Sequence, residues 1–104
     1  FASALRLDPY EPSALYNLGL LALEEAPETT DTARRARVWF ERYLTMAPRD
    51  ATGWMRLGQA SERSGDLTRA EEAYLRGIEL APRNEQFRRT LEELRARRRA
   101  RPDG

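Results

Sequence analysis

The chain has 104 residues, which leaves room for one domain of ordinary size. It contains no cysteine and no histidine, which excludes disulfides, thiol chemistry and the side chain best suited to proton transfer near neutral pH. All 18 basic residues are arginine and 17 acidic residues nearly balance them, so the net charge of +1 does not favour nucleic acid or an anionic membrane as a partner.

A repeated pattern marks the ends of helices. An aromatic residue is followed eight positions later by proline in three segments, which are Phe1 to Pro9, Phe40 to Pro48 and Tyr74 to Pro82. A large apolar residue stands two positions before each of these prolines. Because proline cannot continue a helix, each segment is typical of an amphipathic helix that stops just before it.

A second kind of segment follows each proline. The pair Leu18–Gly19 recurs as Leu57–Gly58, and apolar residues surround both pairs at helical spacing. We expect these residues to form the core side of the helices: Leu15, Leu18, Leu21 and Ala22 in one, and Trp54, Leu57, Ala60 and Ser61 in the other. Glycine is unfavourable inside a helix, so its recurrence indicates a close approach of two helices. The unit is therefore a helix, a turn and a helix.

Two stretches depart from this regular unit. The polar stretch from Glu24 to Thr32 lengthens one turn by five residues, and it ends in Asp31 and Thr32, either of which can cap the next helix. Residues 85–100 carry Phe87, Leu91 and Leu94 on one face and arginines elsewhere. This pattern is typical of a terminal helix with one face on the last repeat and the rest in water, although a further, divergent repeat is the alternative.

Residues 51–84 resemble a tetratricopeptide repeat, whose period is about 34 residues. The residues that carry the resemblance are Trp54, Leu57, Gly58, Ala70, Tyr74 and Pro82, while Ser61 replaces the usual tyrosine. Residues 12–50 match more loosely, with the extended turn. Residues 1–11 are interpreted as the tail of a preceding repeat, and residues 85–104 as the terminal helix with a frayed end. The resemblance implies an all-α fold in which antiparallel helical hairpins stack into a right-handed superhelix.

The resemblance also implies that a peptide or a partner helix binds in a concave groove lined by the first helix of each repeat. The expected groove residues are Ser13, Tyr16, Asn17, Leu20, Leu23, Thr52, Met55, Arg56, Gln59 and Arg89. An exposed apolar strip of Tyr16, Leu20, Leu23 and Met55 would favour an apolar or amphipathic ligand. The alternatives are that an upstream repeat or the long turn covers this strip, or that Asn17 and Arg56 form part of a carboxylate clamp. Thr52 departs from the clamp pattern, which has lysine there.

A cluster of arginines near the end of the chain offers a second candidate contact, with an anionic partner. Its members are Arg95, Arg97, Arg98, Arg99 and Arg101. No aromatic residue is interleaved to stack on bases, and arginine suits the C-terminal end of a helix, so a solvated helix end is the favoured interpretation. Nucleic acid and membrane are both disfavoured as partners.

The sequence offers no catalytic chemistry. It has no phosphate-binding glycine loop, no nucleophile paired with a base and no cluster with metal-ligand spacing, so we expect neither an enzyme nor a cofactor. The expected partner is a protein or a peptide. A second copy of the chain is the structural alternative, because a homodimer could cover an open face near Phe1, Ala4, Leu5 and Tyr16.

Overall fold

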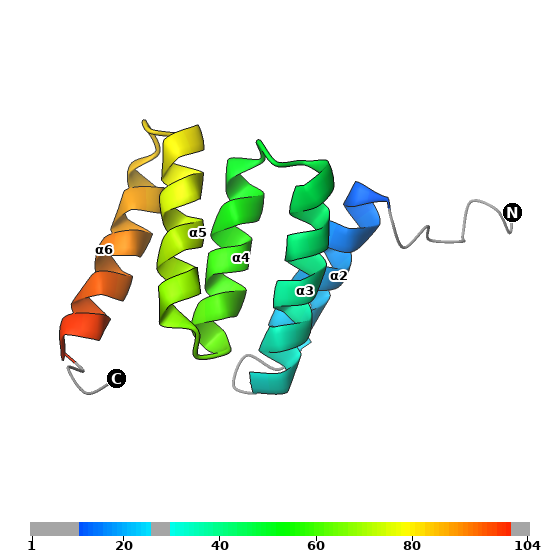
Figure 1. Ribbon diagram of the computed structural model, residues 1–104, viewed down its shortest axis with the longest axis horizontal. Helices are drawn as coiled ribbons and strands as arrows, with labels where there is room; N and C mark the ends of the chain where they lie inside the picture. Colours follow the sequence, from blue (N-terminus) through cyan, green and yellow to red (C-terminus); the bar gives the residue numbers. More distant parts are fainter. Residues whose placement is uncertain (1–10, 26–29, 101–104) are drawn as a thin grey trace, which may run out of the picture.

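The computed structural model describes residues 11–25 and 30–100, and every regular element in this part of the chain is an α-helix. The all-α prediction is confirmed. The helices, labelled as in Figure 1, are α2 (Pro12–Glu25), α3 (Thr30–Met46), α4 (Ala51–Arg63), α5 (Leu67–Leu80) and α6 (Glu85–Ala100).

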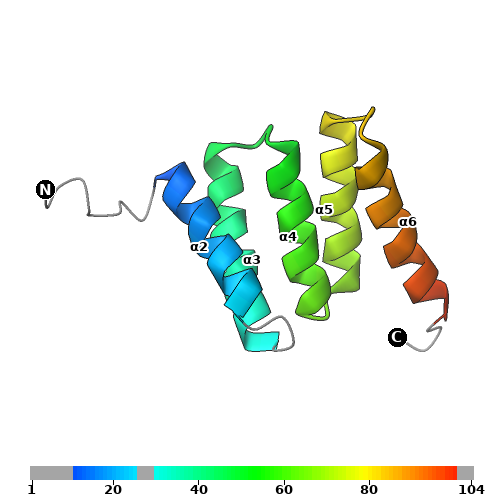
Figure 2. The same ribbon diagram turned by 180° about the vertical axis from the view of Figure 1, so that it is seen from behind.

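Consecutive helices run antiparallel and lie side by side in chain order, so that α2 packs on α3, α3 on α4, α4 on α5 and α5 on α6 (Figure 1). The helices form two layers. In Figure 1, α3 and α5 lie in front, whereas α2 and α4 lie in front when the molecule is seen from behind (Figure 2). We call these two surfaces the α3–α5 face and the α2–α4 face.

Short polar side chains and prolines set the limits of the helices. Asp50 precedes α4 and accepts a hydrogen bond from the Gly53 backbone N–H at 3.1 Å, and Asp66 does the same for α5 from Arg69 at 3.0 Å. The helices α3 and α5 each end two residues before proline, as the sequence predicts. However, α3 begins at Thr30, so Asp31 lies within its first turn, where a carboxylate favours the helix dipole.

Two clusters of apolar side chains hold the helices together. One lies among α2, α3, α4 and α5, and its buried members are Leu23, Ala36, Phe40, Leu44, Leu57, Ala60 and Ala73. The other joins α4, α5 and α6, and consists of Met55, Ala70, Tyr74, Leu91 and Leu94. The prediction that α6 packs through Leu91 and Leu94 is confirmed, because both are buried. The helix α4 contributes to both clusters.

The recurring glycines allow an aromatic ring to reach the backbone of the facing helix. A Cβ atom built on Gly58 would lie 2.3 Å from the Tyr74 ring, and one on Gly19 would lie 2.7 Å from the Phe40 ring. No real side chain fits within such distances. The predicted reason for the Leu–Gly pairs, a close approach of two helices, is therefore confirmed.

We expect Gly58→Ala to destabilise the fold, although alanine favours helix over glycine by about 1 kcal/mol. The added methyl group must displace the buried Tyr74 ring, and overpacking of this kind costs about 1–3 kcal/mol. The free energy of unfolding from urea denaturation checks this. Gly77→Ala is the comparison with the smaller expected loss, because its Cβ would lie 2.8 Å from the flexible end of Met55 and 3.1 Å from the Ala51 carbonyl oxygen, and no aromatic ring is displaced. A Gly58→Ala variant as stable as the parent chain would contradict the packing argument.

One residue predicted for the core is exposed. Leu21 is 54% exposed, whereas Leu23, expected on the surface, is 6% exposed. The face of α2 that packs on α3 passes through Leu15, Gly19 and Leu23, which are four residues apart. Because successive residues turn by about 100°, Leu21 points roughly 200° away from Leu23. The predicted stripe was therefore wrong for Leu21.

Ser61 is fully buried in α4, and its hydroxyl oxygen has no hydrogen-bond partner among the described residues. A buried hydroxyl without a partner costs about 1–3 kcal/mol. This residue stands where a tetratricopeptide repeat usually has tyrosine.

We expect Ser61→Ala to raise the free energy of unfolding by about 1 kcal/mol, because it removes the unpaired hydroxyl and keeps the helix. Thermal and urea denaturation would measure the change. Thr90→Ala is a suitable comparison, since the Thr90 hydroxyl already donates to the Gln86 carbonyl at 3.0 Å. Equal or lower stability of Ser61→Ala would show that the hydroxyl is satisfied.

Candidate interaction surfaces

On the α2–α4 face, an arginine of α4 connects two polar side chains. The Arg56 Nε donates to the Tyr16 hydroxyl of α2 at 3.3 Å, and its Nη1 donates to the Gln59 Oε1 at 3.1 Å. The Tyr16 ring in turn meets Phe40 and Tyr43 edge-on, with centroid distances of 5.6 and 5.1 Å. The guanidinium of Arg56 is thus held in place from both helices.

A second contact joins the same two helices at their other end. Arg63, in the last turn of α4, donates from Nη1 to the Leu23 backbone carbonyl near the C-terminal end of α2, at 2.9 Å. Carbonyls in the last turn of a helix have no partner within the helix, and a cation there is favoured by the dipole. Arg56 and Arg63 therefore place two positive charges along the line between α2 and α4.

A hollow of about 350 Å³ lies where α2, α3 and the start of α4 meet. Its lining residues are Pro12, Ser13, Tyr16, Asn17, Tyr43 and Asp50. The Tyr43 hydroxyl donates to the Asp50 carboxylate, which also caps α4. Burial and this bond to a negatively charged acceptor raise the pKa of Tyr43 to about 12. The hollow thus combines exposed polar groups with a fixed carboxylate.

The raised pKa of Tyr43 predicts how stability depends on pH. Above pH 10 the unfolded chain loses a phenol proton that the folded chain keeps up to about 12. The contribution of Tyr43 to stability is thus complete below pH 10 and is lost as the pH rises through 12. Phenolate absorbance should show one tyrosine titrating near 12. Asp50→Asn keeps the helix cap but removes the negative acceptor, so it should lower that pKa. An unchanged titration in Tyr43→Phe would contradict the assignment.

The structure corrects the expected apolar strip. Leu23 and Met55 are both 6% exposed and belong to the two core clusters, and Tyr16 and Leu20 pack against the first cluster and are half-buried. Met55 is buried because it packs into the cluster that α4 shares with α5 and α6. An exposed apolar strip on the α2–α4 face is therefore not present among these residues.

The other expected groove residues lie at the surface, although they do not all come together. Ser13, Asn17 and Thr52 are exposed, and Arg56 and Gln59 are half-buried. Arg89 is exposed too, but it lines a separate hollow formed by α6 alone, with Glu92, Glu93, Ala96 and Arg99. The sites on α2 and α4 are thus brought together, while Arg89 is apart from them.

The arginine cluster of α6 is largely engaged with acidic residues of the neighbouring helices. Arg95 and Arg98 pair with Glu71 of α5 at 3.1 and 2.8 Å, and Arg97 pairs with Glu62 of α4. Arg99 is exposed, and Arg101 lies outside the described residues. The paired arginines attach α6 to the stack, so they offer less charge to an outside partner than the sequence suggested.

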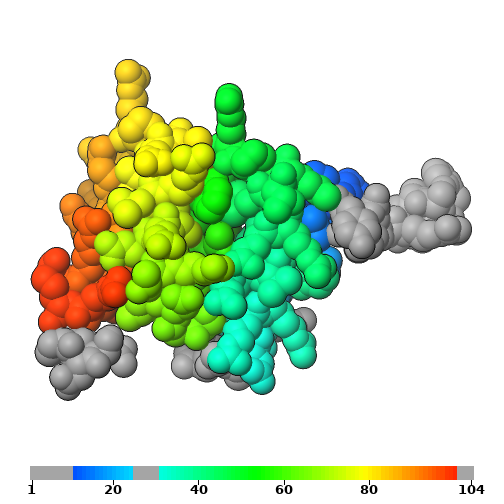
Figure 3. Space-filling view, viewed as in Figure 1, coloured from blue at the N-terminus to red at the C-terminus, as the bar shows by residue number. Residues whose placement is uncertain are grey.

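Sequence reasoning missed a larger hollow on the opposite surface. It measures about 450 Å³ and lies between α3 and α5, with α4 at its base (Figure 3). The available signal is Trp54, which the sequence pattern places on the core side of its helix. Trp54 is only half-buried, and it forms the floor of this hollow. Helices that are not adjacent in the chain form the walls, so only the tertiary arrangement reveals the site.

Within residues 11–25 and 30–100, no group of acidic side chains has the arrangement of a metal site, and none of the helices is long and apolar enough to cross a membrane.

The tetratricopeptide repeat family profile matches residues 30–85, which is just over half of the chain and includes α3, α4 and α5. The chain belongs to the tetratricopeptide repeat family. No curated protein matches it. Domains of this family generally serve as scaffolds for protein–protein interaction, and the stacked helical hairpins of Figure 1 are the architecture of such a scaffold.

Proposed function

We propose that this tetratricopeptide repeat domain holds a peptide or a partner helix along its α2–α4 face. The observation that supports this most directly is the position of Arg56, whose guanidinium bridges Tyr16 of α2 and Gln59 of α4. A cation that is held from two sides loses little freedom when a ligand binds, so more of its interaction energy contributes to affinity.

The ligand we favour is polar and carries carboxylates. With Leu23 and Met55 buried and Leu20 half-buried, the expected groove residues that stay exposed are polar, and Arg56 and Arg63 supply positive charge. The acidic Glu62 on α4 is already engaged by Arg97 and by the Tyr74 hydroxyl, so it does not neutralise them. Arginine pairs well with carboxylates through its planar donors. An acidic segment therefore suits this surface better than the apolar one that the sequence alone favoured.

A pair of isosteric substitutions tests the proposal without disturbing the core. Asn17→Asp and Gln59→Glu together keep the side-chain volumes and add two negative charges to the α2–α4 face, one of them at the hydrogen-bond partner of Arg56. We expect the immobilised double variant to retain acidic peptides about tenfold or more weakly than the immobilised parent chain does, because like charges across an interface repel. Circular dichroism would first confirm that the double variant remains helical.

The matched control changes charge on the other surface. Glu72→Arg lies on α5 and leaves the α2–α4 face intact, so it should retain the same partners. Equal retention of partners by the double variant and the parent chain would move binding away from this face. If sedimentation shows that the parent chain is a dimer and the double variant is a monomer, self-association would be favoured over binding of another protein. The exposed Leu21 supports that alternative.

A further inference from the structure

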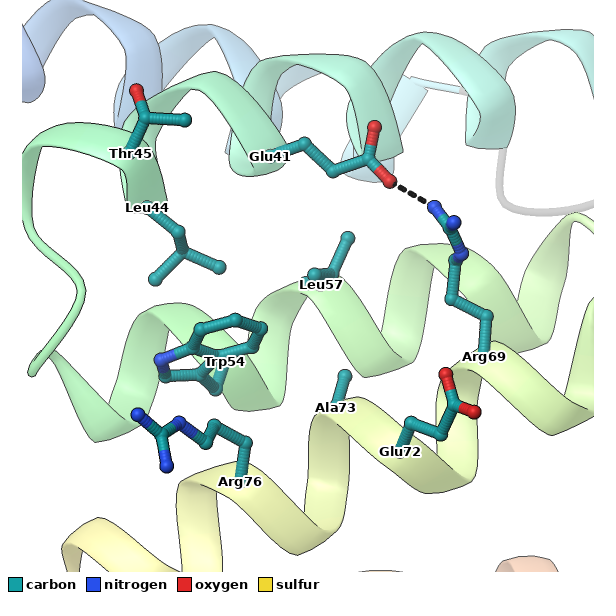
Figure 4. A pocket seen from close by; sticks show the side chains of 9 residues that line it. All are labelled: Glu41, Leu44, Thr45, Trp54, Leu57, Arg69, Glu72, Ala73 and Arg76. Atoms are coloured by element: carbon teal, nitrogen blue, oxygen red, sulfur yellow. Dashed lines mark hydrogen bonds and ion pairs between the residues drawn. The ribbon is translucent and has the colours of Figure 1, made fainter.

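The hollow on the α3–α5 face has an apolar floor and charged walls (Figure 4). Its lining residues are Glu41, Leu44, Thr45, Trp54, Leu57, Arg69, Glu72, Ala73 and Arg76. Leu44, Leu57 and Ala73 are nearly fully buried at its base, and the Trp54 indole lies among them. A cavity of about 450 Å³ can accept a large apolar side chain.

The indole of Trp54 is fixed before any ligand arrives. Its Nε1 donates to the Pro48 carbonyl at 2.8 Å, and the Arg76 guanidinium lies 6.0 Å from the ring centroid. Both contacts leave part of the ring open to the hollow, since the residue is half-buried. Rigid aromatic surface in a pocket is the usual anchor of a binding hot spot, because little entropy is lost on binding.

Some of the charged side chains around the hollow have a partner of opposite charge, and one does not. Glu41 and Arg69 pair across it at 2.5 Å, from α3 to α5 (Figure 4). Arg76 pairs with Glu79 of the same helix at 2.9 Å. Glu72 is exposed, and it makes no hydrogen bond or ion pair with any residue in the described part of the chain. The wall therefore has one unpaired charge, and it is negative.

Apolar side chains also lie on the two helices that border the hollow. Val38 on α3 is one turn from Glu41, and Leu75 on α5 is one turn from Glu72. Both are 40% exposed. Neither lines the hollow itself, so they add apolar surface only for a ligand that extends beyond the cavity over α3 or α5.

We propose that the hollow on the α3–α5 face binds a basic amphipathic helix of another protein. A large apolar side chain of that helix enters the cavity over Trp54, and a lysine or arginine one turn away pairs with Glu72. Apolar floor, fixed indole and unpaired carboxylate all match this one chemistry. The site is independent of the α2–α4 face, so either proposal can fail without the other.

A selection from phage-displayed helical peptides with randomised surface positions tests the proposal on the intact 104-residue chain. We expect the enriched peptides to share Leu, Met, Phe or Trp with Lys or Arg three or four residues away, the spacing that places both on one helix face. In NMR spectra, these peptides should shift the indole N–H signal of Trp54, which Trp39→Phe distinguishes from the only other tryptophan.

Charge reversal separates the proposed site from nonspecific attraction. Glu72→Arg should weaken the enriched peptides by about tenfold or more, because it opposes their basic residue. Glu92→Arg is the matched control: Glu92 is also exposed, lies on α6 outside this hollow, and should leave affinity unchanged. Asn17→Asp with Gln59→Glu should also leave it unchanged.

Several results would overturn the proposal. Failure to enrich any peptide, enrichment of acidic sequences, or equal binding by Glu72→Arg would each exclude a basic helix at this site. Sedimentation of the chain as a dimer that Glu72→Arg dissociates would show that a second copy occupies the hollow instead.

Discussion

Two aromatic rings determine the spacing of this stack. The ring of Phe40 on α3 lies against Gly19 of α2, and the ring of Tyr74 on α5 lies against Gly58 of α4. In both places the ring is so close to the backbone that a residue with a Cβ atom would clash with it. Both rings are almost fully buried. Because each hairpin closes through such a contact, the separation of its helices is set by the thickness of a ring. The positions of the two faces follow from that separation.

The sequence revealed this contact because the residues that make it recur at regular spacing. The helices, their ends before Pro48 and Pro82, and the role of the Leu–Gly pairs could all be predicted from local rules. The exposure of single apolar residues could not. Whether Leu21 or Leu23 faces the core depends on a small rotation of α2 about its axis, and a short window of apolar residues does not determine that rotation.

The candidate sites were predictable only in part for a related reason. Asn17, Thr52 and Arg56 were placed on one surface because they sit on equivalent helices at matching positions. Met55 was lost from that surface because it packs into a cluster with α5 and α6, which depends on how the later helices dock. The hollow on the α3–α5 face could be predicted only from the relative positions of three helices. The sequence around Trp54 does not indicate which side of the indole stays open.

The Glu62 carboxylate serves two partners, the Tyr74 hydroxyl of α5 and the Arg97 guanidinium of α6. The same helix α6 contributes Leu91 and Leu94 to the apolar cluster that contains Met55. Docking of α6 thus couples an ion pair at the surface to apolar packing beneath it, so a change that separates Arg97 from Glu62 would also loosen the packing of this cluster.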